Sequence, residues 1–95
     1  MKLINMAIKA DKPRIIPDED LQQLQAISSK LKAIREQKGL KFEAFAKHSG
    51  VHRTTLFKIE KNGQNLNLST FLKVLRGLDM TPMQFFQSLE EQASE

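Results

Sequence analysis

The 95-residue chain contains no cysteine, tryptophan or tyrosine, and it has no long run of apolar residues. Without cysteine, disulfide bonds, thiolate metal ligands and cysteine nucleophiles are excluded, and the composition is compatible with a reducing compartment. The apolar runs are shorter than the roughly 20 residues needed to span a bilayer, and the N-terminus lacks the apolar core of a signal peptide. We therefore expect a single-domain, soluble, cytoplasmic protein with no membrane contact.

Acidic residues are scarce in the middle of the chain. Residues 30–76 hold 11 basic and three acidic residues, a formal net charge of +8, whereas the whole chain carries +4. A basic segment of this kind suits a polyanionic partner such as a nucleic acid. The same charge would also fit a solvated, lysine-rich surface, and charge alone does not decide between the two.

Residue types that support catalysis or metal binding are also few. The only histidines, His48 and His52, flank Gly50. A glycine at that place interrupts a helix, so the two imidazoles do not share a face as a metal-binding pair would. The chain has no glycine-rich phosphate loop and no pair of carboxylates suited to acid–base work. We expect no enzyme, no catalytic residue, no metal and no cofactor.

Apolar residues recur at three- and four-residue steps along most of the chain, which predicts an all-α fold. Thr81 and Gln84 form a capping box, and Asn67 can cap the preceding helix. Gly39 and Gly63 follow expected helix ends. The five expected helices cover approximately residues 18–38, 42–48, 52–61, 68–78 and 82–89. Apolar faces are expected on the last two, from Leu68, Phe71, Leu72, Leu75 and Leu78, and from Phe85, Phe86 and Leu89.

The two ends of the chain differ in composition from the domain expected at 18–89. Residues 1–17 form an N-terminal arm, in which partial apolar alternation over 2–9 allows a short strand and two prolines at 13 and 17 favour extended backbone. The arm has three open alternatives: no fixed structure, a strand paired with another chain, or an extended segment along a nucleic acid. Residues 90–95 form a short acidic tail that we expect to fray.

Residues 42–61, FEAFAKHSGVHRTTLFKIEK, carry the most specific pattern. Ala46 is small enough for two helices to cross closely, and Gly50 accepts the positive φ that a tight turn needs. Val51, Leu56 and Ile59 then restart an apolar stripe, with basic and hydrogen-bonding residues between them. This is the layout of two short helices joined by a turn, a helix-turn-helix.

With these residues the chain resembles the lambda-repressor-like helix-turn-helix domains, the Xre family of bacterial and phage transcription regulators, over residues 31–86. The matching segments are LKAIREQKGL, AFAKHSGVHRTTLFKIEKN and LNLSTFLKVLRGLDMTPMQFF. The resemblance implies a five-helix bundle that binds a double-stranded DNA operator as a homodimer and regulates transcription; of repression and activation, which the sequence leaves open, we favour repression. It also implies a structural ion pair between Arg35 and Glu60, which from the residues alone are only opposite charges beside apolar positions.

The resemblance places the base-reading residues at the start of the third helix: His52, Arg53, Thr54 and, one turn on, Lys58. Among these, Arg53 is the strongest candidate because arginine can bond guanine O6 and N7 together. Phosphate contacts are expected from Lys41, Lys47, Thr55 and Lys61. Alternatives stay open: Arg53 contacts phosphate alone, His52 only caps the helix, and the lysines are solvated surface.

Two aromatic residues depart from the family pattern. Phe42 stands where glutamine is common, and Phe57 stands where a polar residue is usual. Either the two pack together or onto the core, or Phe57 contacts a thymine methyl group; we favour packing.

Two further questions concern partners. The chain could be the antitoxin of a toxin–antitoxin pair, binding a toxin protein through residues 1–17, or a module that binds protein alone. A dimer interface could use Leu21 and Leu24, the final helix with Phe85, Phe86 and Leu89, or the arm. Those helical residues could equally pack within one chain.

Overall fold

The computed structural model describes residues 17–64 and 66–93, and these form five helices. The helices are α2 (Asp18–Gln37), α3 (Phe42–Ser49), α4 (Arg53–Asn62), α5 (Leu68–Gly77) and α6 (Pro82–Ala93). No strand occurs among these residues, and the expected all-α, five-helix fold is confirmed. The expected arm, with its possible strand, lies outside the described residues except for Pro17.

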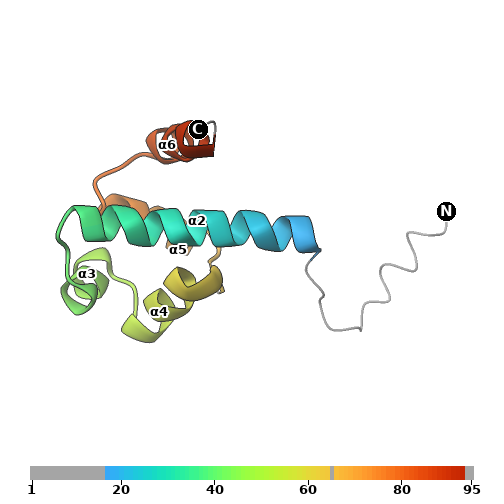
Figure 1. Cartoon of the computed structure of the whole chain (residues 1–95). Helices are drawn as coiled ribbons and strands as arrows, with labels where there is room; N and C mark the ends of the chain where they lie inside the picture. Colours follow the sequence, from blue (N-terminus) through green and yellow to red (C-terminus); the bar gives the residue numbers. More distant parts are fainter. Residues whose placement is uncertain (1–16, 65, 94–95) are drawn as a thin grey trace, which may run out of the picture.

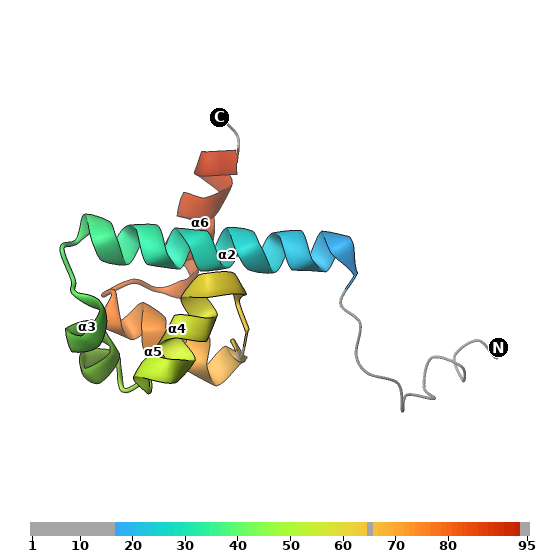
Figure 2. The same ribbon diagram turned by 60° about the horizontal axis from the view of Figure 1, so that its bottom comes forward.

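The long helix α2 is the spine of the bundle. Helices α3 and α4 lie on one side of α2, and α6 lies on the other (Figure 1). Helix α4 packs along α2, α3 packs on both α4 and α5, and α6 contacts α2 and α5. The first turns of α2 project beyond the other helices in both views (Figures 1 and 2).

A single apolar core joins the helices. It contains Leu31, Ile34, Phe45, Ala46, Val51, Leu56, Ile59, Phe71, Val74, Leu75, Leu78 and Phe85. Leu56 and Ile59 are completely buried, so one face of α4 is committed to the core. The apolar residues expected to join α3 and α4 to the other helices are therefore buried as expected.

Local sequence signals account for the helix starts. The Asn67 side chain accepts a hydrogen bond from the Thr70 amide at 2.9 Å, which caps α5. At α6, the Thr81 amide donates to Gln84 Oε1 at 2.9 Å and the Gln84 amide donates to Thr81 Oγ1 at 3.1 Å. The capping box is thus formed in full, and two amides that the helix leaves without backbone partners are satisfied.

Two glycines determine how α4 is placed. Gly50, at φ 77°, ends α3 and forms the turn into α4. Gly63, at φ 81°, ends α4 and is buried against α2, where an added Cβ would lie 3.2 Å from both Cβ and O of Leu24. Both backbone conformations favour glycine, and the second also needs the space that glycine leaves.

Three expectations about side chains and ends need correction. Leu68 was expected on the apolar face of its helix, but it begins α5 and is 72% exposed. Phe85, one candidate for a dimer interface, is fully buried in the core of one chain. The acidic tail expected at 90–95 is helical as far as Ala93, because glutamate, glutamine and alanine favour helix and no glycine or proline interrupts them.

Within the described residues, no helix has both the length and the hydrophobicity needed to cross a membrane.

Candidate DNA interface

The start of α4 is exposed along the side that faces away from the core. His52, Arg53, Thr54 and Lys58 are all exposed, whereas Leu56 and Ile59 are buried. The four candidate base-reading residues therefore lie along the first two turns of α4, accessible to a partner. No acidic residue occurs in the first turn of α4, so the positive end of the helix dipole and the Arg53 charge reinforce each other.

His52 caps α4. Its Nδ1 accepts a hydrogen bond from the Thr54 amide at 3.2 Å, and its backbone is extended as expected of a capping residue. The capping role, which was one alternative to a base or phosphate contact for this residue, is therefore present. Because the imidazole is exposed, the cap leaves Nε2 accessible to a partner.

Arg53 is paired, although weakly. Its Nη1 donates to Glu43 Oε2 at 3.0 Å, and the two side chains are 64% and 71% exposed. An exposed pair of this kind contributes about 0–1 kcal/mol. A bidentate contact with guanine discriminates by roughly 1–3 kcal/mol, so DNA could displace the carboxylate at little cost. Glu43 belongs to the first turn of α3 and was not among the expected site residues.

Arg35 and Glu60 form a buried, bidentate ion pair between α2 and α4. Arg35 Nε lies 2.7 Å from Glu60 Oε2, and Arg35 Nη2 lies 3.1 Å from Glu60 Oε1. A third bond joins Arg35 Nη1 to the Leu40 carbonyl oxygen at 2.6 Å, and the guanidinium lies 5.6 Å from the centre of the Phe42 ring. Both charged side chains are only 8% exposed. The pair therefore belongs to the scaffold, which agrees with the role implied by the family resemblance.

Ser28 supports the far end of α4 and was not singled out for this role in the sequence. Its buried hydroxyl lies 2.7 Å from the Ile59 carbonyl oxygen and 2.8 Å from the Glu60 carbonyl oxygen. These carbonyls belong to the last turn of α4, where the helix offers few backbone donors. A serine on an apolar face was the only sequence signal for this contact.

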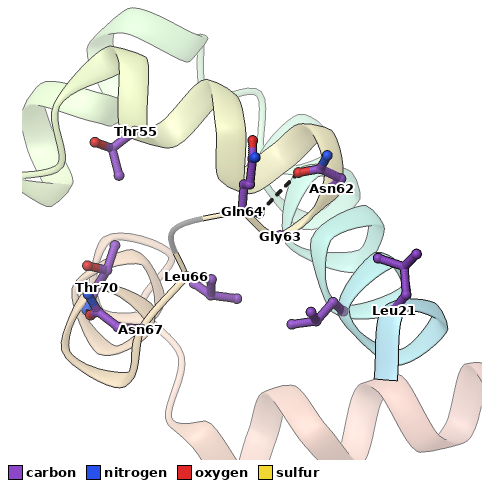
Figure 3. A pocket seen from close by; sticks show the side chains of 9 residues that line it. Leu21, Thr55, Asn62, Gly63, Gln64, Leu66, Asn67 and Thr70 are labelled. Atoms are coloured by element: carbon purple, nitrogen blue, oxygen red, sulfur yellow. Dashed lines mark hydrogen bonds between the residues drawn. The ribbon is translucent and has the colours of Figure 1, made fainter. Parts of the chain in front are cut away.

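The expected phosphate-binding residues are spread over two helices. Lys41 occupies the N-cap position of α3 without a side-chain capping hydrogen bond, Lys47 lies in the last turn of α3, and Lys61 lies in the last turn of α4; all three are exposed. Thr55 differs, because it is half-buried and lines a hollow of about 760 Å³ together with Leu21, Gln64 and other residues (Figure 3). Thr55 thus faces the hollow beside the α4–α5 loop, on nearly the opposite side of α4 from Arg53.

The two unusual phenylalanines have different environments. Phe42 is half-buried against the core, as the packing interpretation predicts. Phe57 is 55% exposed and belongs to no ring cluster, so the same interpretation is wrong for this residue. The exposed residues next to Phe57 on α4, Thr54, Lys58 and Lys61, are polar or charged.

Among the described residues, no three or more histidine, aspartate or glutamate side chains gather in a way that could hold a metal ion. His48 is exposed in the last turn of α3, and His52 is occupied as the cap of α4.

Known proteins with a similar sequence cover the same part of the chain. A family model described as helix-turn-helix matches residues 31–86. Antitoxin HipB of Escherichia coli strain K12 is 31% identical over 55 residues, which are 58% of this chain and 62% of that protein. Antitoxin HipB of Escherichia coli O6:H1 is also 31% identical over 55 residues, 58% of each chain. This chain therefore spans about three fifths of the curated relatives it matches.

Solved structures resemble a larger share of the chain. The wild-type restriction-modification controller protein C.Esp1396I has a TM-score of 0.69 and 30% identity, covering 76% of this chain and 95% of its own. The same values describe the C.Esp1396I tetramer in complex with its natural 35 base-pair operator. The family model matches more than half of the chain, and the ion pair between Arg35 and Glu60 and the turn at Gly50 agree with the match. This chain therefore belongs to the lambda-repressor-like helix-turn-helix family.

Proposed function

We propose that this protein binds a specific double-stranded DNA operator as a homodimer and regulates transcription, with the start of α4 in the major groove. One observation carries the proposal: α4 buries one face completely while His52, Arg53, Thr54 and Lys58 stay exposed at its first turns. A helix held in this way can enter a groove about 12 Å wide and bring its N-terminal side chains to base edges. The proposal assigns the chain no catalytic step and no cofactor.

The charge of the same region supports a DNA partner. Residues 30–76 carry a formal net charge of +8, and Lys41, Lys47 and Lys61 are exposed on the two helices of the motif. Lysines of this kind neutralise phosphates and fix the position of the protein without reading sequence. The relation to C.Esp1396I, a protein described in complex with its operator, agrees with this role.

Selection of duplexes from a random pool at physiological salt tests the proposal. We expect an enriched sequence with two half-sites in inverted orientation, about one helical turn apart. Enrichment of no sequence, with retention that depends only on charge and disappears at modest salt, would reject sequence-specific binding.

Two alanine variants separate base reading from phosphate contact. Arg53→Ala should relax the preference at one base pair of each half-site, at a cost of roughly 1–3 kcal/mol for the preferred sequence. Lys61→Ala should weaken binding to all sequences. It should also flatten the slope of log K against log salt by about one unit for each phosphate contact that is lost. The measurement is titration of both variants against the selected operator and its single-base variants. If Lys61→Ala changes base preference and Arg53→Ala does not, the two roles are reversed.

The likeness to antitoxin HipB favours a second candidate function, in which the protein binds its own operator and a toxin protein. The expected toxin-binding segment, residues 1–17, lies almost entirely outside the described residues. Co-purification with the product of a neighbouring small gene, lost on deletion of residues 1–16, would support this function. A homo-oligomer that purifies without any such partner when the two genes are expressed together would count against it.

A further inference from the structure

Phe57 is an aromatic residue without a structural partner in the core. Of the six phenylalanines, Phe45, Phe71 and Phe85 are buried, Phe42 packs against the core, and Phe86 packs against two other rings. Phe57 is 55% exposed and takes no part in these contacts. An exposed ring contributes little to the stability of the folded chain, so packing does not explain a phenylalanine at this position.

The ring stands between two cations on the recognition side of α4. Arg53, Phe57 and Lys61 follow at four-residue steps and therefore lie along one strip of the helix. Lys61 Nζ is 5.9 Å from the centre of the Phe57 ring, at the outer limit of a cation–π contact. A cation over one face leaves the rest of the exposed ring accessible to a partner.

The major groove offers such a ring one kind of apolar partner. Base edges there present hydrogen-bond donors and acceptors, except for the C5 methyl group of thymine. A 5-methylcytosine presents a methyl group on the same ring carbon. We propose that Phe57 reads the C5 methyl group of a pyrimidine in the operator, an inference that rests on the proposed placement of α4 in the major groove.

Helix geometry limits where the methyl group lies. Four residues of α-helix rise about 6 Å, and successive base pairs along B-DNA rise about 3.4 Å. Phe57 thus reaches a base pair roughly two steps from the one that Arg53 contacts. The methyl-bearing pyrimidine occurs once in each half-site, since each half-site receives one copy of α4.

The test removes only the methyl group from the DNA. Each thymine of the selected operator is replaced in turn by deoxyuridine, and binding is measured for the full chain and for Phe57→Ala. We expect the full chain to bind about fourfold more weakly at one thymine per half-site, the effect of one unburied methyl group. Phe57→Ala should bind the thymine and deoxyuridine operators equally. Phe57→Leu, which keeps an apolar side chain, should retain part of the difference.

A second arm distinguishes thymine from 5-methylcytosine. At the sensitive base pair, replacement of T·A by C·G should weaken binding. Methylation of that cytosine at C5 should then raise the affinity of the full chain about fourfold, and it should leave the affinity of Phe57→Ala unchanged. Because Phe57 is exposed, the urea midpoint of Phe57→Ala should match that of the full chain, which excludes unfolding as the cause.

The outcomes separate this inference from the function on which it rests. If no operator is enriched, the proposed function is rejected, and the methyl contact, which depends on it, is rejected too. If an operator is enriched and bound but every deoxyuridine substitution is neutral, Phe57 reads no methyl group and only this inference fails. A thymine-dependent loss that persists in Phe57→Ala assigns the methyl contact to another residue and also overturns the inference.

Discussion

Arg35 is a polar residue at which a single substitution should cost much of the stability of the fold. Its guanidinium bonds both carboxylate oxygens of Glu60 and the Leu40 carbonyl, and both charged side chains are almost completely buried. Arg35→Met removes the cation and leaves the Glu60 carboxylate buried without its partner, which typically costs about 3–5 kcal/mol. Urea unfolding followed by circular dichroism measures the change in the free energy of unfolding.

The double variant provides the control for this prediction. In Arg35→Met with Glu60→Met, both buried charges are gone, so the loss should be clearly smaller than the sum of the two single losses. Additive losses would mean that the two side chains stabilise the fold independently, contrary to the observed bidentate contact.

Individual residue roles could be predicted only in part. The apolar positions 45, 51, 56 and 59 follow from helical periodicity, and the structure buries all of them. The pairing of Arg35 with Glu60 came from the family resemblance, because no spacing rule joins residues 25 positions apart. The Arg53–Glu43 pair and the Ser28 contacts were missed for the same reason. Each of these contacts depends on how two helices cross, which periodicity does not encode.

At the scale of helices, Gly63 controls how closely the end of α4 approaches α2. Gly63→Ala introduces a Cβ that would lie 3.2 Å from the backbone oxygen of Leu24, in addition to the cost of a positive φ. Gly50→Ala is a matched control, because Gly50 has a similar φ of 77° but nothing within 4 Å of the added Cβ. We expect Gly50→Ala to lose about 1 kcal/mol of unfolding free energy and Gly63→Ala about 1–3 kcal/mol more.

The same urea titrations decide this prediction. Equal losses at the two glycines would show that only backbone conformation matters and that α2 can move away from α4 without cost. A larger loss at Gly63 would establish that the contact with Leu24 holds the two helices in register.

Helix boundaries were largely predictable because their signals are local. The capping box at Thr81, the cap at Asn67 and the glycines after α2 and α4 depend on residues within one helical turn of each other. Two features were not predictable in this way. Leu68 has the spacing of the apolar face of α5 but lies at the exposed start of that helix. Residues 90–93 were expected to fray because of their acidic composition, yet they belong to α6. Both depend on where a helix ends relative to the core.

At the scale of the whole molecule, the exposed apolar side chains indicate where two copies of the chain could form a dimer. Four of the five large apolar side chains that are exposed in the described residues belong to α5 and α6: Leu68, Leu72, Met83 and Phe86. A module of this size buries too little surface on one half-site for tight operator binding, whereas a dimer doubles the contact. The exposed residues of α6 and the half-buried Leu21 and Leu24 of α2 remain the described candidates for the dimer interface.

Met83 distinguishes these two candidate interfaces, because its side chain is 76% exposed and its replacement leaves the core unchanged. With an interface on α6, Met83→Glu places two like charges in that interface and should raise the dimer dissociation constant at least about tenfold, as measured by sedimentation equilibrium. Leu21→Glu, at the projecting end of α2, should leave this constant within about twofold. The opposite result would place the interface at the start of α2. With the α6 interface, Met83→Glu should also reduce the affinity gained from a second half-site while sparing the single-base preferences of α4, since these depend on Arg53 and its neighbours.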